Sequence, residues 1–194
     1  MKKLSLLLAF AIVTNAFVWA QASHPVKRPV AAKPEAPAPA ASPTFRPGTV
    51  TGSFTVNGKK AIFKYVYAFL QQGSFDSDRE NVYVILSDAP VTEAMLAEEF
   101  GLSKEAGDGK LHAIRVEFNE KMQPGMGHLY HDGFKEMSAM SSQGTHDFAP
   151  SSYDGKSLAG KLSAKPQKSD EDRWEYSATF SAPINPKPKS MAKQ

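Results

Sequence analysis

Residues 49–70 read TVTGSFTVNGKKAIFKYVYAFL, and this stretch decides the fold. Apolar and polar residues alternate from 49 to 56, a period of two that indicates a strand with one buried face. Asn57-Gly58 follows, a pair typical of a two-residue hairpin turn because both turn positions require positive φ. The return strand, from about 60 to 70, is apolar on both faces. We therefore expect it to lie centrally in a sheet or between two layers.

The same alternation continues along the chain as far as residue 184. Further strands are predicted at 82–87, 111–118, 126–131, 143–148, 158–163 and 173–182. A single helix is predicted between Thr92, a suitable N-cap, and Gly101, a suitable terminator. The fold class we expect is all-β: an antiparallel sandwich or barrel of about eight strands with one short helix.

The first 22 residues have the pattern of an export signal. Lys2 and Lys3 precede an apolar run from 4 to 20, and Ala20-Gln21-Ala22 supplies the small residues that a signal peptidase accepts. A retained membrane anchor is the alternative, but the run is short beside the roughly 20 apolar residues of a spanning helix. We predict that residues 1–22 are a signal peptide, that the protein is periplasmic or secreted, and that no integral membrane span remains after cleavage.

Segments rich in proline flank the predicted domain. Residues 23–48 contain seven prolines and six alanines, so we expect a disordered Pro/Ala-rich linker. The linker either tethers the domain away from a surface or has no task of its own. The β-rich domain then spans 49–184, and residues 185–194 form a disordered basic tail.

The composition excludes several classes of function. The chain contains no cysteine, which excludes disulfides, thiol nucleophiles and thiolate metal sites. Residues 49–184 carry 14 basic and 19 acidic groups, a net charge of −5. Phosphate contacts need clustered Lys and Arg, so we expect no nucleic-acid partner. The sequence also lacks a nucleotide-binding glycine loop, a Gly-x-Ser-x-Gly elbow and a His-Glu-x-x-His motif.

Five phrases of the domain carry a resemblance. They are YVYAF at 65–69, VYVILSDAPV at 82–91, LYHDGF at 129–134, THDFAPSSYDGKSLAGKL at 145–162 and YSATFSAPI at 176–184. In these phrases the chain resembles secreted bacterial proteins that consist of a single β-rich domain of unknown function. The resemblance implies one domain, and it carries over neither an activity nor a site residue.

Methionine and histidine gather in one stretch of the chain. The candidate ligands of a soft metal are Met122, Met126, His128 and His131, with Met137 and Met140 farther along. Thioether sulfur and imidazole suit Cu(I), and an exported protein without cysteine would have to build a soft site from them. In a strand, Met126 and His128 would share a face and His131 would point to the other. The alternative is that the methionines fill gaps in the core and the histidines line a surface.

A hydrolytic zinc site is a further hypothesis. Such a site needs three protein ligands and an open position, and His112 and His146 could converge if their strands are neighbours. Asp132 or Asp147 could then orient a ring through its second nitrogen. The alternative for His112 is a buried, hydrogen-bonded ring, because it shares the face of Ile114 and Val116 in the strand pattern.

The function we expect is non-enzymatic. The chain is predicted to be a binding or interaction domain of the cell envelope, and its partner is an envelope protein or a small ligand. An aromatic row, formed by Phe63, Tyr65, Tyr67 and Phe69, would either line a cleft for such a ligand or form core. Copper binding at the Met/His stretch is the alternative function, and hydrolysis comes third. No cofactor other than copper is implied.

Overall fold

The computed structural model describes residues 45–74, 78–98, 100–168 and 171–188. The predicted signal peptide, most of the predicted linker and the end of the basic tail lie outside these residues. The strands, in chain order, are β1 (Thr49–Val56), β2 (Lys59–Ile62), β3 (Tyr65–Gln72), β4 (Glu80–Ser87), β5 (Ala113–Phe118), β6 (Pro124–Tyr130), β7 (Ser138–Ser141), β8 (Asp147–Tyr153), β9 (Ser157–Lys168) and β10 (Arg173–Asn185). Two short helices, α1 (Glu93–Ala97) and α2 (Gly101–Gly107), lie between β4 and β5.

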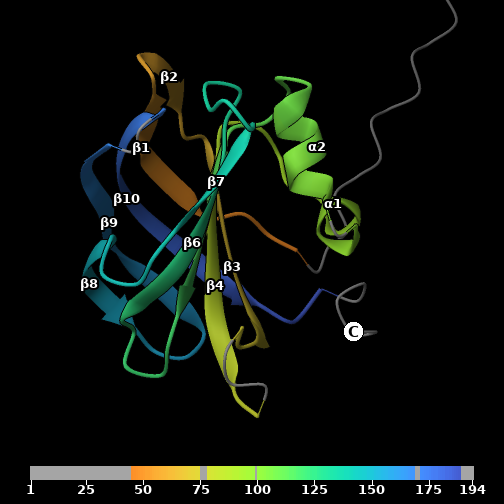
Figure 1. The fold of residues 1–194 in the computed structure, drawn as a ribbon. Coiled ribbons are helices and arrows are strands. Elements are labelled where there is room, and N and C mark those ends of the chain that lie inside the picture. Colours follow the sequence, from red (N-terminus) through yellow and green to blue (C-terminus); the bar gives the residue numbers. More distant parts are fainter. Residues whose placement is uncertain (1–44, 75–77, 99, 169–170, 189–194) are drawn as a thin grey trace, which may run out of the picture. The chain divides into compact units, whose positions relative to one another are not determined.

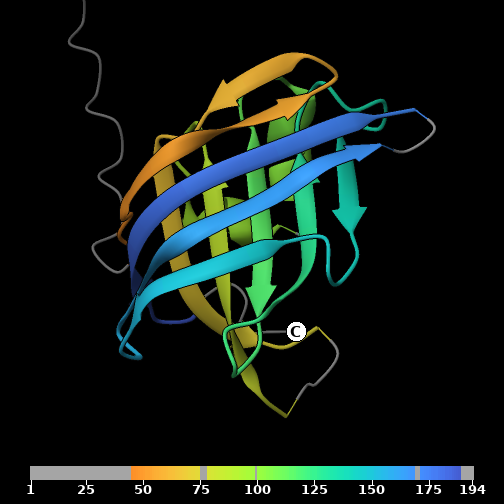
Figure 2. The same cartoon turned by 90° about the vertical axis from the view of Figure 1, so that its left-hand side faces the viewer.

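The ten strands form one mixed sheet that folds into two layers. The first layer has the order β2-β1-β10-β9-β8, and the second has the order β3-β4-β5-β6-β7; all pairs within each layer are antiparallel. The end of β10 joins the layers, because Ile184 pairs in parallel with Ala68 of β3. Figure 2 shows the strands of the first layer crossing in front of those of the second.

These observations confirm the predicted all-β class and refine it. The sheet does not close on itself, so the architecture is a sandwich and not a barrel. The described residues contain ten strands and two helices, where about eight strands and one helix were expected. Neither helix of the described residues has the length or the apolar character needed to cross a membrane.

The hairpin at residues 57–58 confirms the predicted turn. Asn57 and Gly58 have φ of 49° and 83°, and Val56 pairs with Lys59. The predicted continuous return strand was wrong: β2 ends at 62 in the first layer, and β3 begins at 65 in the second. Phe63 packs between the layers where the chain crosses. The two apolar faces of this stretch therefore belong to two different strands.

Two hydrophobic cores hold the layers. The inner core lies between the two layers and includes Phe54, Val84, Leu129 and Leu162. The outer core lies between the second layer and the helices, which cover the side of that layer away from the first (Figure 1). Tyr67 and Phe69 belong to the outer core and Phe63 belongs to the inner core. The aromatic row is therefore packed as core on two sides of the second layer.

The helices begin and end differently from the prediction. Thr92 does act as the N-cap of α1, because its Oγ1 accepts a hydrogen bond from the Met95 N–H at 3.2 Å. Gly101, however, begins α2 instead of ending a single helix. A Cβ at this position would lie 2.2 Å from the Met95 carbonyl oxygen, so only glycine permits this close approach of the two helices.

Residues outside 49–184 also take part in the fold. Phe45 is buried and stacks on Tyr67 with ring centroids 4.8 Å apart. Asn185, buried at the end of β10, accepts a hydrogen bond from the Arg46 N–H at 2.8 Å and donates to the Ala68 carbonyl at 3.0 Å. These contacts attach both ends of the described domain to β3.

Candidate functional site

Loops at one end of the second layer bring four polar side chains together. Asp88 directly follows β4, His112 directly precedes β5, and His131 and Asp132 directly follow β6. Because β4, β5 and β6 are consecutive antiparallel strands, the end of β4, the start of β5 and the end of β6 lie at the same edge of the sheet. We call Asp88, His112, His131 and Asp132 the His–Asp cluster.

Asp88 holds His112 by both its backbone and its ring. One carboxylate oxygen accepts the His112 backbone N–H at 2.7 Å, and the other lies 2.6 Å from Nδ1. A carboxylate only accepts hydrogen bonds, so Nδ1 carries the hydrogen. Nε2 faces Oδ1 of Asp132 at 3.1 Å, where a protonated ring donates a hydrogen bond to the carboxylate and a neutral ring offers a lone pair to a metal ion. A carboxylate on the far nitrogen is the usual way to orient a metal-ligating histidine.

The His131 ring is buried between the inner core and the ring of His112. Only 1% of the residue is exposed; its ring meets Phe54 at 90° with centroids 5.1 Å apart and lies 4.2 Å from the His112 ring. Burial, with a further contribution from His112, lowers the pKa of His131 to about 4. The ring is therefore neutral at physiological pH.

The bonding of the His131 ring is incomplete. Nδ1 accepts the Gly133 N–H at 2.8 Å, and Nε2 has no hydrogen-bond partner among the described residues. Nδ1 also lies 3.1 Å from Oδ1 of Asp132. Gly133 makes the close contact possible, since a Cβ there would lie 2.8 Å from the Val56 carbonyl oxygen and 2.9 Å from Nδ1.

Lys59 fixes the orientation of Asp132. Its Nζ lies 3.2 Å from Oδ2 of Asp132, which leaves Oδ1 for the two histidines. Burial raises the pKa of Asp132, but the hydrogen bonds from Lys59 and His112 outweigh burial and hold the pKa below its usual value. The carboxylate is thus ionised at neutral pH.

The geometry of the cluster fits a transition-metal ion. One ligand atom from each of His112, His131 and Asp132 lies within 4.8 Å of the others. Two of the separations are 3.1 Å, whereas ligand atoms about 2.0–2.1 Å from a tetrahedral ion are about 3.3 Å apart. Nδ1 of the neutral His131 ring and Nε2 of His112 thus face the same carboxylate oxygen. A cation between these three atoms would stabilise the arrangement.

The residues predicted as soft-metal ligands lie on two faces. His128 stacks on Tyr130 of the outer core, with centroids 6.4 Å apart and planes at 13°, whereas His131 packs against the inner core. This split confirms the predicted alternation along β6. Met122 packs against the inner core from the turn after β5, and Met126 is half-buried in β6. Of the four predicted ligands, only His131 belongs to the His–Asp cluster.

His146 lies in a separate buried network and does not join His112. Its Nδ1 is 2.6 Å from the Tyr176 hydroxyl and its Nε2 is 2.5 Å from the Ser141 Oγ, which donates to the Gly127 carbonyl at 3.2 Å. Since the serine hydrogen goes to Gly127, Nε2 donates to Ser141 and Nδ1 accepts from Tyr176. A histidine that activated a serine nucleophile would accept from it instead. The arrangement is a satisfied hydrogen-bond chain.

Part of the cluster follows from the sequence. The sequence predicts that Asp132 or Asp147 orients a histidine ring, and in the structure Asp132 lies 3.1 Å from Nε2 of His112. Asp88 and Lys59 were missed. The signal that could have found Asp88 is its position directly after a predicted strand, at the sheet edge where the residues flanking two neighbouring strands must gather.

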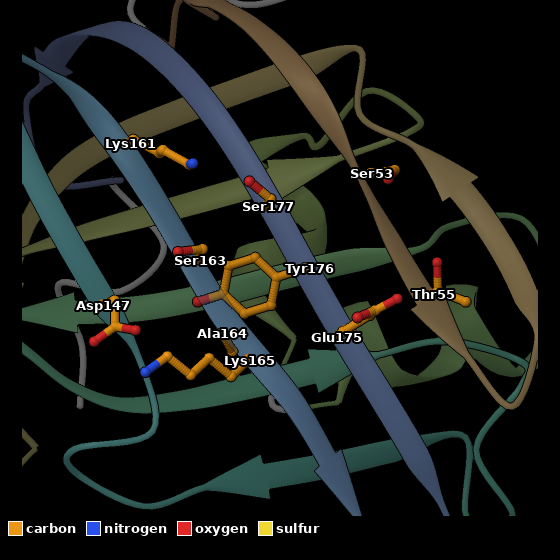
Figure 3. Close-up of a pocket in the computed structure, with 10 residues that line it drawn as sticks. All are labelled: Ser53, Thr55, Asp147, Lys161, Ser163, Ala164, Lys165, Glu175, Tyr176 and Ser177. Carbon is orange, nitrogen blue, oxygen red and sulfur yellow. The ribbon is translucent and has the colours of Figure 1, made fainter.

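A groove on the exposed face of the first layer is a second candidate site. It has a volume of about 410 Å³, and Figure 3 shows the side chains that line it: Ser53, Thr55, Asp147, Lys161, Ser163, Ala164, Lys165, Glu175, Tyr176 and Ser177. The groove contains two lysines and two acidic residues, so its formal charges cancel and it favours neither an anionic nor a cationic ligand. None of these residues is a histidine, and Tyr176 belongs to the inner core.

No protein-family model, no curated protein and no solved structure matches this chain. The resemblance to secreted bacterial proteins therefore stays a prediction, and the function must be inferred from the site itself.

Proposed function

We propose that this protein binds a divalent transition-metal ion, zinc above all, through His112, His131 and Asp132. The observation that carries the proposal is the convergence of three possible ligand atoms, with 3.1 Å from Oδ1 of Asp132 to Nε2 of His112 and to Nδ1 of His131. A proton on Nε2 of His112 would turn one of these two contacts into a hydrogen bond and leave the contact at Nδ1 of His131 unchanged. A metal ion bound between the three atoms would stabilise both contacts.

The donor set favours zinc. Imidazole nitrogen and carboxylate oxygen are its ordinary ligands, and three protein ligands leave the fourth tetrahedral position open for water or a ligand group. Asp88 and Lys59 act as positioning residues, because each holds the far side of a proposed ligand. Cu(II) would bind the same donors at least as tightly in the general affinity order, so availability decides between the two ions.

Binding costs the cluster little. Nδ1 of His131 would exchange the Gly133 hydrogen bond for the metal, and a hydrogen bond contributes about 1 kcal/mol net. Structural zinc sites bind with roughly 10 kcal/mol or more. Neither hydrophobic core includes a residue of the cluster, so we expect the domain to fold in the absence of metal and to bind the ion at a prepared site.

The location outside the cytoplasm belongs to the same proposal. Export through residues 1–22 would place the site in the envelope, where the metal ion would be the small ligand of a non-enzymatic binding domain. The absence of a nucleophile–base pair in the His146 network supports this over hydrolysis.

Zinc titration of the purified full chain tests the proposal. After removal of metal with a chelator, competition against a chromophoric zinc indicator should give one ion per chain. His112→Ala and Asp132→Asn should abolish this binding, and Asp88→Asn should weaken it by roughly 10- to 100-fold.

His128→Ala is the matched control, because it removes a histidine of the same strand region that lies on the other face. It should leave zinc affinity unchanged. The proposal fails if His112→Ala and Asp132→Asn both bind zinc as tightly as the unaltered protein, or if His128→Ala alone removes the binding.

A further inference from the structure

We infer that a second, softer metal site lies on the outer face of the second layer, where Met126, His128 and Met140 bind Cu(I). This inference goes beyond the proposed zinc site: the residues, the face of the sheet and the class of ion all differ. Its experiment can therefore fail while the zinc site stands, and the converse also holds.

The strand register brings the three side chains together. His128 of β6 lies directly opposite Met140 of β7. Directly opposite residues share a face and have Cβ atoms about 4.5–5.5 Å apart. Met126 precedes His128 by two residues and lies in a β-bulge of β6 opposite Glu117. It borders a cavity that Glu117 also lines, and this places it on the side of the sheet where His128 lies. One methionine therefore lies opposite His128 on the neighbouring strand, and the other lies two residues away along β6.

His128 has a ring that is available to a metal. It stacks on Tyr130, and neither ring nitrogen has a hydrogen-bond partner among the described residues. Burial lowers the pKa of His128, and the charge of Arg115 lowers it further, against a smaller opposite effect of Glu117. The ring is therefore neutral at physiological pH, the form that ligates metal.

The two methionines are accessible from solvent. Met140 is 63% exposed on an edge strand of the sheet and belongs to neither core. Met126 is half-buried and borders a cavity of about 190 Å³ that Glu117 and Gln143 also line. A small ion can therefore reach both sulfur atoms without rearrangement of the core.

The positive charge of Arg115 acts on this site, but its guanidinium is held by two other residues. Arg115 pairs with His128 on its other side, but its guanidinium lies 4.6 Å from the centre of the Tyr83 ring and donates to Gln71 at 2.7 Å. Glu117 supplies a negative charge nearby: burial raises its pKa, but hydrogen bonds from Asn81 and Ser74 outweigh burial and lower the pKa.

Ligand softness selects the ion. Thioether sulfur and imidazole prefer Cu(I) to zinc, and this chain has no thiol to compete for it. The structure therefore changes the set of ligands expected from the sequence. Met126 and His128 remain, whereas Met122 packs on the inner core, His131 joins the His–Asp cluster, and Met140 takes their place.

An anaerobic titration with Cu(I), supplied as its bicinchoninate complex, tests the inference on the purified full chain. The protein should withdraw one Cu(I) per chain from the indicator. Met140→Leu and Met126→Leu keep the apolar shape and remove the sulfur, and each should lower the affinity by at least about tenfold. His128→Ala should lower it further.

Met137→Leu is the matched control, since Met137 is also exposed but its sulfur lies against Gly107 of α2. It should leave Cu(I) affinity unchanged, as should His112→Ala, which removes only the zinc site. The inference is overturned if Met140→Leu and Met126→Leu bind Cu(I) like the unaltered protein, or if Met137→Leu weakens binding to the same extent.

Discussion

Two buried histidines of this fold, His146 and His131, differ in the bonding of their rings. Burial lowers the pKa of both to about 4. Both nitrogens of His146 are hydrogen-bonded, to Tyr176 and Ser141. His131 has one hydrogen bond, and its bonded nitrogen also faces Asp132.

The difference shows which observation identifies a candidate site. Burial and a shifted pKa are common to both rings, so neither property separates a structural histidine from a ligand. Of these two rings, only that of His131 has an unpaired nitrogen and lies among other possible ligand atoms. His146 connects β7, β8 and β10 within the inner core, whereas His131 is held in a form that can accept a cation.

The largest effect we expect is a pH dependence of stability that comes from His146. The unfolded histidine takes up a proton near pH 6.5, but the folded one stays neutral down to about pH 4. Stability is therefore complete above pH 6.5 and falls by about 3 kcal/mol on acidification to pH 4. Urea unfolding of the metal-free protein at pH 7 and pH 4 measures the total loss, which also contains the contributions of His131 and of the carboxyl groups with lowered pKa, so a comparison variant is needed.

His146→Gln is the comparison variant for that measurement, because glutamine keeps hydrogen-bonding groups and does not titrate. His131 contributes equally to both proteins and cancels. The loss between pH 7 and pH 4 should be about 3 kcal/mol smaller in His146→Gln. Equal losses in the two proteins would show that the ring protonates in the folded state.

The second effect is stabilisation by zinc at the other histidine. Free zinc at 100 times its dissociation constant should raise the free energy of unfolding by about 2.7 kcal/mol, because the ion binds only the folded cluster. Thermal or urea unfolding with and without zinc gives this value. His146→Gln should retain the full gain and His112→Ala should show none. A gain that survives in His112→Ala would place zinc elsewhere.

The third effect compares leucine substitutions of the two rings at neutral pH without metal. His146→Leu leaves the Tyr176 hydroxyl buried without a partner, whereas His131→Leu releases one hydrogen bond from Gly133 and removes an unpaired Nε2. We expect His146→Leu to cost about 2 kcal/mol more than His131→Leu. Urea unfolding of the two variants measures the two losses in the free energy of unfolding. A larger loss in His131→Leu would contradict the assignment of His146 as the histidine with a structural role.

The sequence predicts local features of this fold well. Alternation along 49–56, the turn at 57–58 and the cap at Thr92 each depend on residues close in the chain. The opposite faces of His128 and His131 follow from the same local period. The break at 63–64 could not be predicted, because an apolar stretch of that length fits one central strand as well as two strands in different layers.

The candidate site depends on strand order, which the sequence does not encode locally. Asp88 and Asp132 lie 24 and 20 residues from His112 and meet it only because β4, β5 and β6 are neighbours. Met140 becomes a partner of His128 for the same reason, through the pairing of β6 with β7. Composition draws attention to the histidines and methionines, but their grouping requires the strand register.

The smallest effect we expect is at Lys59, whose pair with Asp132 is exposed to solvent. Exposed ion pairs contribute about 1 kcal/mol or less, so Lys59→Ala should change the free energy of unfolding by less than about 1 kcal/mol. The ammonium group orients Asp132 but also repels a metal ion nearby. These effects oppose each other, so zinc affinity should change only a few-fold. Calorimetric titration of Lys59→Ala beside Asp132→Asn separates the two roles. Complete loss of zinc binding in both variants would contradict this expectation. It would mean that Lys59 is needed to hold the Asp132 carboxylate in place, so that His131 differs from His146 also in depending on a charged neighbour.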